Sequence, residues 1–290
     1  MAPVRLIRCA GPQEFLDRAK PLLMTDEACH NLLLGIPANL IARAAALDSP
    51  PYFAVAVDGD RAVGAAMMTP PHPLVLSQAQ DRGALGLIAR DLAAARMMPR
   101  GVNAPVPLGE EFANIWSRLT GERCEQAMAQ RIYRLTAMRP VAGVPGSLRR
   151  ATEEHRHLLV AWLRAFNAEA FADHAAPFDA EQVVDRRLHG QTEGLYLWED
   201  RGPRAVAGYT GPTPHGIRVG PVYTPPEHRN HGYGSACTAE LSQLLLDQGY
   251  RFCFLYTDVA NLTSNRIYQR IGYEPVCDVT VHRFLPAEPD

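Results

Sequence analysis

The sequence lacks several features that would place the protein in particular functional classes. Its 29 basic and 31 acidic residues nearly balance, which gives a formal net charge of −2 for 290 residues. No excess of charge therefore favours a nucleic acid or an anionic membrane as a partner. The longest apolar region, residues 32–47, is interrupted by Pro37 and Arg43 and is too short to span a bilayer. We expect no nucleic acid and no membrane among its partners.

The cysteines and histidines show no spacing typical of a metal site. The six cysteines are scattered without a Cys-x-x-Cys pair, and their apolar neighbours predict buried thiols in a reducing compartment. His228 and His231 lie close together, but no set of ligands with suitable spacing accompanies them. The first 13 residues contain Arg5, Arg8 and two prolines instead of an apolar signal core. We expect a cytoplasmic protein without a metal site.

Residues 219–235 contain a glycine-rich turn, yet they lack the signatures of the two commonest nucleotide-binding loops. A Gly-Lys-Ser/Thr ending is absent, and only one glycine of the dinucleotide-binding pattern precedes Tyr233. A strand-prone stretch ends at two prolines, and Gly232 and Gly234 precede residues with helical spacing. Because the N–H groups at the start of a helix attract anions, we predict a pyrophosphate-binding turn.

A second patterned stretch follows this turn. Residues 251–257 form a nearly unbroken apolar and aromatic run, which is typical of a strand buried on both faces. Asn261 is a good helix N-cap and Gly272 a good helix terminator. Asn261, Asn265 and Tyr268 follow one another at spacings of four and three, which places them on one face of the helix.

The glycine turn and the polar helix face together resemble the GNAT superfamily of N-acetyltransferases. Arg-x-x-Gly-x-Gly, from Arg229 to Gly234, resembles the coenzyme A loop of that superfamily. The Asn-x-x-x-Asn-x-x-Tyr face, followed by Ile-Gly-Tyr, resembles its second coenzyme A motif. The resemblance covers residues 147–284. It implies an enzyme, an N-acetyltransferase that transfers acetyl from acetyl-CoA directly to a primary amine.

The resemblance also implies roles for individual residues. The backbone of Val222, Tyr223 and Thr224 would bind the pantetheine arm like an added strand, and would stabilise the developing oxyanion. The loop that wraps the pyrophosphate would comprise Arg229, Asn230, His231, Gly232, Tyr233, Gly234 and Ser235.

On the helix face, Tyr268 would be the general acid that protonates the coenzyme A thiolate as it leaves. A phenol suits this role because its usual pKa of about 10 keeps it protonated at neutral pH. Asn261 would either contact the cofactor or serve only as the helix cap. Asn265 lies within the helix, where asparagine is unfavourable, and this favours a contact with the cofactor.

The general base and the acceptor are the least defined parts of the predicted site. In some members of the superfamily a glutamate on the strand before the loop helps to remove the amine proton, but residues 217–220 contain none. Glu169, Asp173 and His174 are the candidates for this role. Glu169 and Asp173 lie four residues apart and would attract a cationic amine together; the alternative is a solvated acidic helix end. An antibiotic, a polyamine, an amino acid and a protein N-terminus all remain open as acceptors.

The order of predicted elements repeats along the chain. The first half is expected to begin with two helices, and the second with a strand over residues 147–151 followed by two helices. Each half would continue with a hairpin (residues 53–69 and 195–210) and then alternate strands and helices. Residues 141–145, with glycine and proline, form a plausible linker. We therefore predict an α+β protein with two GNAT-like domains, residues 1–140 and 141–290. Each would be a central mixed, mostly antiparallel sheet flanked by helices.

The first domain is expected to have lost the cofactor site. Residues 115–119 correspond to residues 267–271, so that Trp116 would replace the catalytic tyrosine and Ala113 would replace the second asparagine. The loop over residues 77–81 has no pair of glycines, and it ends in Asp81, which would repel a pyrophosphate.

Three alternatives to an N-acetyltransferase remain. The first is an acyltransferase that uses another acyl-CoA. The second is a non-catalytic, acyl-CoA-binding regulatory protein, which the missing strand glutamate keeps open although Tyr268 favours an enzyme. The third is a nucleotide-dependent enzyme, which the missing loop lysine disfavours.

Overall fold

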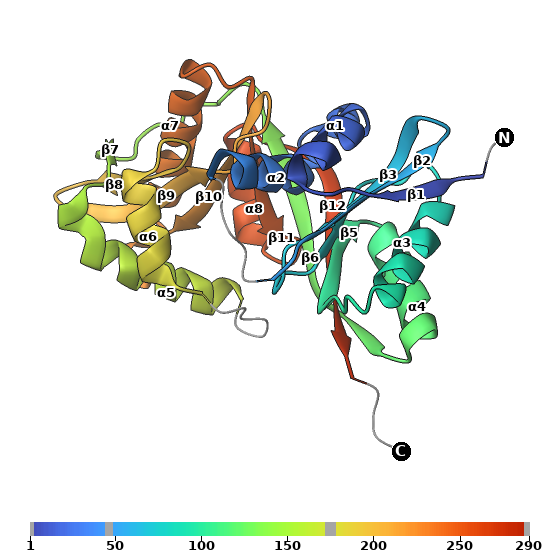
Figure 1. The fold of residues 1–290 in the computed structure, drawn as a ribbon. Coiled ribbons are helices and arrows are strands. Elements are labelled where there is room, and N and C mark those ends of the chain that lie inside the picture. Colours follow the sequence, from blue (N-terminus) through green and yellow to red (C-terminus); the bar gives the residue numbers. More distant parts are fainter. Residues whose placement is uncertain (1–2, 44–48, 172–177, 287–290) are drawn as a thin grey trace. The chain divides into compact units, whose positions relative to one another are not determined.

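The computed structural model describes residues 3–43, 49–171 and 178–286 (Figure 1). The chain divides into two compact units. The first comprises Met1–Ile132, Asp258–Ala260 and Val276–Asp290, and the second comprises Tyr133–Thr257 and Asn261–Pro275. Each unit combines strands of a mixed sheet with flanking helices, which confirms the predicted α+β class.

The bounds of these units differ from the domain bounds expected from the sequence. Strand β6 (Arg123–Leu135) passes from the first unit to the second after Ile132, and strand β12 (Glu274–Leu285) begins in the second unit and continues in the first. Residues 279–283 of β12 pair antiparallel with strand β5 (Gly101–Pro105), which gives the C-terminal strand its partner within the first unit. The division at residues 140 and 141 stays a prediction.

The first unit has the strand order β1-β2-β3-β4-β5-β12, in which β4 and β5 are parallel and the other neighbours antiparallel. Its remaining elements are β1 (Arg5–Arg8), α1 (Pro12–Leu23), η1 (Met24–Asp26), α2 (Asn31–Arg43), β2 (Tyr52–Asp58), β3 (Arg61–Met68), β4 (Leu74–Leu76), α3 (Gly83–Ala94) and α4 (Leu108–Thr120). The sequence does not predict β1, because four residues bounded by two arginines show no clear alternation.

The second unit has the strand order β11-β10-β9-β8-β7, in which β10 and β11 are parallel and the other neighbours antiparallel. Its elements are β7 (Ser147–Arg150), η2 (Glu153–His155), α5 (Arg156–Ala170), α6 (Ala180–His189), β8 (Gly194–Glu199), β9 (Pro203–Thr210), β10 (Gly216–Tyr223), η3 (Pro226–His228), α7 (Tyr233–Asp247), β11 (Phe252–Asp258) and α8 (Leu262–Arg270).

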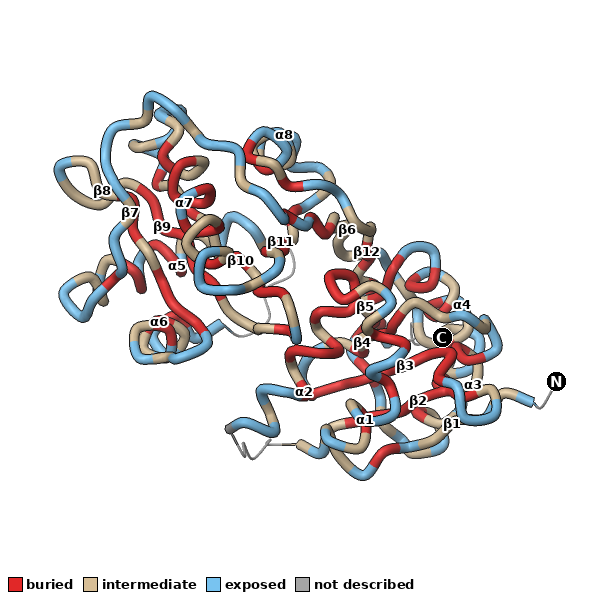
Figure 2. Tube along the Cα trace, turned by 90° about the horizontal axis from the view of Figure 1, so that it is seen from above, coloured by how far each residue is buried: buried red, intermediate tan, exposed pale blue. Residues whose placement is uncertain are grey.

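Helices cover both faces of the sheet in the second unit. Ala205, Ala207 and Tyr209 of β9 pack into a core that includes buried residues of α7. Val206, between them, packs instead with buried residues of α5 and α6. Successive side chains of a strand point to opposite faces, so α7 lies on one face and α5 with α6 on the other. Buried residues follow the strands and the inner sides of these helices (Figure 2).

One prediction about the cysteines is wrong. Cys29 and Cys277 form a disulfide bond within the first unit. They lie 248 residues apart, so no local pattern shows that β12 brings Cys277 to Cys29. Cys9, Cys237 and Cys253 are buried free thiols as predicted, whereas the free thiol of Cys124 is only half-buried.

Candidate functional site

Strand β10 of the second unit carries a bulge directly before the residues expected to bind pantetheine. Its parallel pairing with β11 joins Gly216–Arg218 to Phe252–Phe254 and ends there. Its antiparallel register with β9 shifts between Val219 and Val222, where Gly220 has a φ of +149°. Bulges bend a strand and leave backbone groups outside the ladder, and they are common beside functional sites.

The glycine turn enters helix α7 as the sequence predicts. Gly232 is the N-cap residue of α7 and has a φ of +82°, which strongly favours glycine. A Cβ atom at Gly232 would lie 2.9 Å from Val144 Cγ2, and one at Gly234 would lie 2.8 Å from Thr224 Oγ1. Close packing therefore disfavours a side chain at either position, and the start of a helix of 15 residues presents its free N–H groups beside them.

The aromatic side chains of the loop are held by protein contacts. The rings of His231 and Tyr233 stack with centroids 5.6 Å apart, and His231 Nδ1 donates to the Arg229 carbonyl at 2.7 Å. The Tyr233 hydroxyl donates to Asp200 Oδ2 at 2.8 Å, and this hydrogen bond raises the pKa of Tyr233. These contacts tie the loop to the turn between β8 and β9.

Two residues that the sequence assigned to different ligands form an ion pair. Arg229 Nη2 donates to both carboxylate oxygens of Glu169, at 2.9 and 2.7 Å, and Arg229 Nε donates to the Thr224 carbonyl. The Tyr223 hydroxyl donates to Glu169 Oε1 at 3.1 Å; burial, followed by this hydrogen bond, raises the pKa of Tyr223. Glu169 thus lies beside the glycine loop. Asp173 and His174 lie outside the described residues.

Tyr268 lies on α8 within the core of the second unit. Its side chain is 8 % exposed, and its ring centroid lies 5.9 Å from that of Tyr273 and 6.5 Å from that of Tyr133. Burial raises its pKa to about 12. Within residues 3–43, 49–171 and 178–286, no group forms a hydrogen bond with its hydroxyl. The phenol is therefore neutral at physiological pH, and within that part of the chain its hydroxyl proton is not donated to any hydrogen-bond acceptor.

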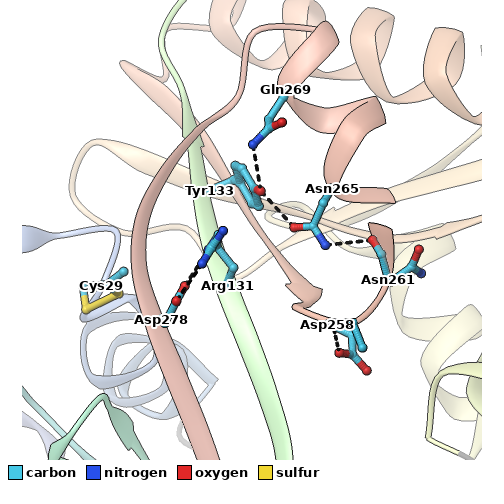
Figure 3. Close-up of polar contacts among 10 residues, drawn as sticks. Cys29, Arg131, Tyr133, Asp258, Asn261, Asn265, Gln269 and Asp278 are labelled. Carbon is cyan, nitrogen blue, oxygen red and sulfur yellow. Dashed lines mark hydrogen bonds and ion pairs between the residues drawn. A yellow bond between two sulfur atoms is a disulfide. The ribbon is translucent and has the colours of Figure 1, made fainter. Parts of the chain in front are cut away.

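The two asparagines of the helix face have structural contacts. Asn261 caps α8 by accepting a hydrogen bond from the Ser264 N–H at 3.0 Å, as its N-cap pattern predicts. Asn265 accepts from the Tyr133 hydroxyl at 2.8 Å and donates to the Asn261 carbonyl at 2.7 Å (Figure 3). Gln269 Nε2 also donates to the Tyr133 hydroxyl, at 3.4 Å. Sequence reasoning missed Tyr133, because it lies on β6, far away in the sequence.

Neither a metal site nor a membrane-spanning helix is present among the described residues. That part of the chain has no group of three or more His, Cys, Asp or Glu side chains placed to hold a metal ion. Among the same residues, none of the helices combines the length and the apolar character needed to cross a membrane.

Comparisons with known proteins agree with this architecture. The family model described as FR47-like protein matches residues 204–282. A mycothiol acetyltransferase from Thermobispora bispora is 30 % identical in an alignment of 154 residues that covers 48 % of this chain and 50 % of that protein. The chain thus matches about half the length of this curated relative.

Solved structures resemble the chain over nearly its whole length. A tandem GNAT protein from the clavulanic acid biosynthesis pathway has a TM-score of 0.60 at 17 % identity, covering 99 % of this chain and 100 % of the other. A GCN5-related N-acetyltransferase from Sphaerobacter thermophilus has a TM-score of 0.62 at 16 % identity, covering 97 % and 95 %. A Drosophila protein has a TM-score of 0.67 at 12 % identity, covering 98 % and 99 %.

Because these structures are only 12–17 % identical to the chain, their similarity shows the fold alone. The match to the family model, by contrast, falls on the part of the sequence that contains the two coenzyme A-like motifs. Residues 204–282 include both the loop from Arg229 to Gly234 and the helix face that ends at Tyr268. The chain thus has the fold of a tandem GNAT protein, and the segment that carries both motifs matches the FR47-like family model.

Proposed function

We propose that this protein is an N-acetyltransferase that transfers acetyl from acetyl-CoA to a primary amine. The observation that carries the proposal is the glycine loop at the start of α7, directly after the bulged strand β10 and in the same unit as Tyr268. The activity in the name of the Thermobispora relative supports acetyl transfer. The identity of the amine does not follow from that name.

The loop fits the pyrophosphate of acetyl-CoA. Glycines at 232 and 234 keep side chains away from the start of α7, where the N–H groups and the positive end of the helix dipole favour an anion. Arg229, Asn230, His231, Tyr233 and Ser235 would complete this cradle. The backbone of Val222, Tyr223 and Thr224, beyond the bulge, would bind the pantetheine arm.

The chemistry requires an amine, a thioester and a proton for the departing thiolate. Acetyl-CoA supplies the thioester carbon that the amine nitrogen attacks. Backbone N–H groups around Val222 would stabilise the negative charge that develops on the thioester oxygen. Tyr268 would then donate its phenolic proton to the sulfur, since its raised pKa keeps that proton in place at neutral pH. Asn261 and Asn265 would act by positioning α8 and by contacts with the cofactor.

The first measurement is a calorimetric titration with acetyl-CoA, which we expect to show one site per chain. In the first unit the Gly83 N–H at the start of α3 donates to Asp81 Oδ1 at 2.7 Å, so a carboxylate already occupies the anion position of that helix. Trp116 is fully buried and donates to Glu122 at 2.7 Å. Two sites would contradict the loss of the first site, and no binding by a folded sample would overturn the proposed function.

The ion pair between Glu169 and Arg229 gives a second prediction. Glu169→Gln should tighten acetyl-CoA binding about two- to fivefold at low salt, because Arg229 is released for the pyrophosphate and the exposed pair itself is weak. If Glu169 also attracts the amine, as the sequence suggested together with Asp173, the KM for the amine should rise.

A matched control for this change is Glu181→Gln, which removes another exposed ion pair, with Arg164, from the same unit. It should leave the Kd for acetyl-CoA unchanged. Weaker cofactor binding by Glu169→Gln would mean that Glu169 positions Arg229 for the cofactor instead of competing with it.

A non-catalytic acyl-CoA sensor is the second candidate function. The observation that favours it is Arg218, which stands in the strand region where some superfamily members have a glutamate. Binding of acetyl-CoA without release of free thiol across a panel of primary amines would select this candidate.

A further inference from the structure

A buried arginine from helix α6 reaches the bulge of β10. Arg187 is 8 % exposed, and its Nη1 donates to the Gly220 carbonyl at 2.7 Å. A Cβ atom at position 208 would lie 2.5 Å from Arg187 Nη1, so Gly208 makes room for the guanidinium. The buried Arg187 Nε has no hydrogen-bond partner within the described residues. A buried polar group without a partner is costly, which points to a missing ligand.

A second arginine lies on the same face of the strand. Arg218 is two residues before Gly220, so its side chain alternates with those of Ile217 and Val219, which pack into the core with α7. Across the ranges that the structure describes, the Arg218 guanidinium forms no hydrogen bond or ion pair. Both arginines therefore belong to the face covered by α5 and α6, opposite α7.

The charges around these two arginines do not balance. Glu193 is 2 % exposed, and its carboxylate attracts the guanidinium groups of both Arg187 and Arg218. The same carboxylate already accepts a hydrogen bond from Arg186 Nε at 3.1 Å. Burial, followed by repulsion from Arg218, lowers the pKa of Arg187 to about 10, and burial also lowers the pKa of Arg218. Both remain protonated at neutral pH. Among the residues that the structure describes, three arginines thus face one carboxylate, which leaves an excess of positive charge there.

We propose that Arg187 and Arg218 bind an oxyanion, a carboxylate or a phosphate, on the amine that the protein acetylates. This inference rests on the proposed function and narrows its acceptor to amines that carry a negative group. Guanidinium groups present planar sets of donors that match carboxylate and phosphate oxygens. Helix α7, whose start would bind the pyrophosphate of acetyl-CoA, covers the other face of the sheet, so the dipole of α7 and the pyrophosphate do not account for these two charges.

The same geometry disfavours an ordinary cationic amine as the acceptor. Within the described residues these two guanidinium groups share one carboxylate with Arg186, and their excess positive charge repels a protonated amine. An amine that carries its own carboxylate or phosphate compensates this repulsion, because the anion contacts the arginines. Some superfamily members have a negatively charged glutamate on this strand, whereas this protein has the positively charged Arg218 there.

Binding is tested on the intact chain saturated with coenzyme A, by the ¹⁵N–¹H signals of the arginine Nε–H groups. The probes are β-alanine, phosphoethanolamine and propylamine, which carry a carboxylate, a phosphate and no anion, with L-tyrosine and tyramine as a larger pair. We expect the anionic probes to shift the Arg187 signal and the two neutral-tailed amines to leave it unchanged. The more effective of β-alanine and phosphoethanolamine identifies the oxyanion.

Substitutions of Arg218 test whether this residue is responsible for the binding of the anionic probes. Arg218→Met should weaken binding of the anionic probes about 10- to 100-fold, the range for a lost hydrogen bond to a charged group. Arg218→Lys should restore part of it. Arg149→Met removes an exposed arginine from β7 of the same unit and should change nothing. Because Arg218 has no partner within the described residues, its loss should leave the melting temperature close to that of the wild type.

Three outcomes would overturn the proposal. They are an Arg187 signal that no anionic probe shifts, equal shifts by anionic and neutral probes, and a preference for anions that persists in Arg218→Met. Acetyl-CoA titrated alone separates this failure from that of the proposed function. If acetyl-CoA binds while the probes fail, only the acceptor inference falls. If acetyl-CoA itself shifts the Arg187 signal and the amines do not, the arginines serve the cofactor and the proposal is again wrong.

Discussion

Tyr268→Phe should lower kcat by at least about 100-fold and leave the Kd for acetyl-CoA within about twofold, the pattern expected when a general acid is removed. The substitution deletes one hydroxyl and keeps the ring, which packs against Tyr273 and Tyr133. The measurement is release of free coenzyme A thiol with a saturating amine, beside a calorimetric titration with acetyl-CoA.

Stability distinguishes a catalytic hydroxyl from a structural one at this position. Within the described chain the Tyr268 hydroxyl has no partner, so phenylalanine should keep or slightly raise the melting temperature. Tyr273→Phe is the matched control. Its hydroxyl bonds the Ser242 hydroxyl at 2.8 Å, so its loss should lower stability by about 1 kcal/mol and leave kcat within about twofold.

The pH dependence follows from the direction of the Tyr268 shift. A pKa raised to about 12 means that the phenol keeps its proton throughout the range in which rates are measured. Loss of activity by deprotonation of Tyr268 would occur only near that pH, on the alkaline side. The pH profile between 6 and 9 should therefore have the same shape in the wild type and in Tyr268→Phe. An alkaline limb in this range that disappears in the variant would mean that Tyr268 is the acid but that its pKa is not raised. An unchanged kcat would remove Tyr268 from the mechanism.

The features that the sequence predicts well are those with local causes. Gly232 and Gly234 permit a backbone that other residues do not, and Asn261 caps the helix that follows it. These signals lie within a few residues of what they determine, so the loop, α7 and α8 can be placed from the sequence alone. The hairpins at residues 53–69 and 195–210 follow equally from local alternation and turns.

The features that it does not predict depend on contacts between distant segments. Tyr133 reaches Asn265 across 132 residues, and Arg229 reaches Glu169 across 60. The hydrogen bond from Arg187 to the Gly220 carbonyl spans 33 residues and depends on a bulge that sequence patterns do not reveal. For these residues the sequence shows the type of side chain, and only the fold shows its partner.

Gly232→Glu should weaken acetyl-CoA binding at least about 100-fold, or about 2.8 kcal/mol at 25 °C. A φ of +82° is strained for any residue with a Cβ, which costs about 1–2 kcal/mol. The new Cβ would also meet Val144 Cγ2 at 2.9 Å, and the carboxylate would repel a pyrophosphate at the start of α7. Calorimetric titration with acetyl-CoA measures the loss.

Two control variants separate the steric contribution to this loss of acetyl-CoA affinity from the electrostatic contribution. Gly232→Lys creates the same backbone strain and the same close contact but has the opposite charge, so its Kd should lie between those of the wild type and Gly232→Glu. Gln248→Glu adds a negative charge at the far, exposed end of α7 and should leave binding unchanged. Equal losses in the glutamate and lysine variants would mean that packing against Val144 alone governs the loop. Wild-type affinity in Gly232→Glu would show that acetyl-CoA does not bind at the start of α7, because no arrangement of a pyrophosphate there tolerates that carboxylate.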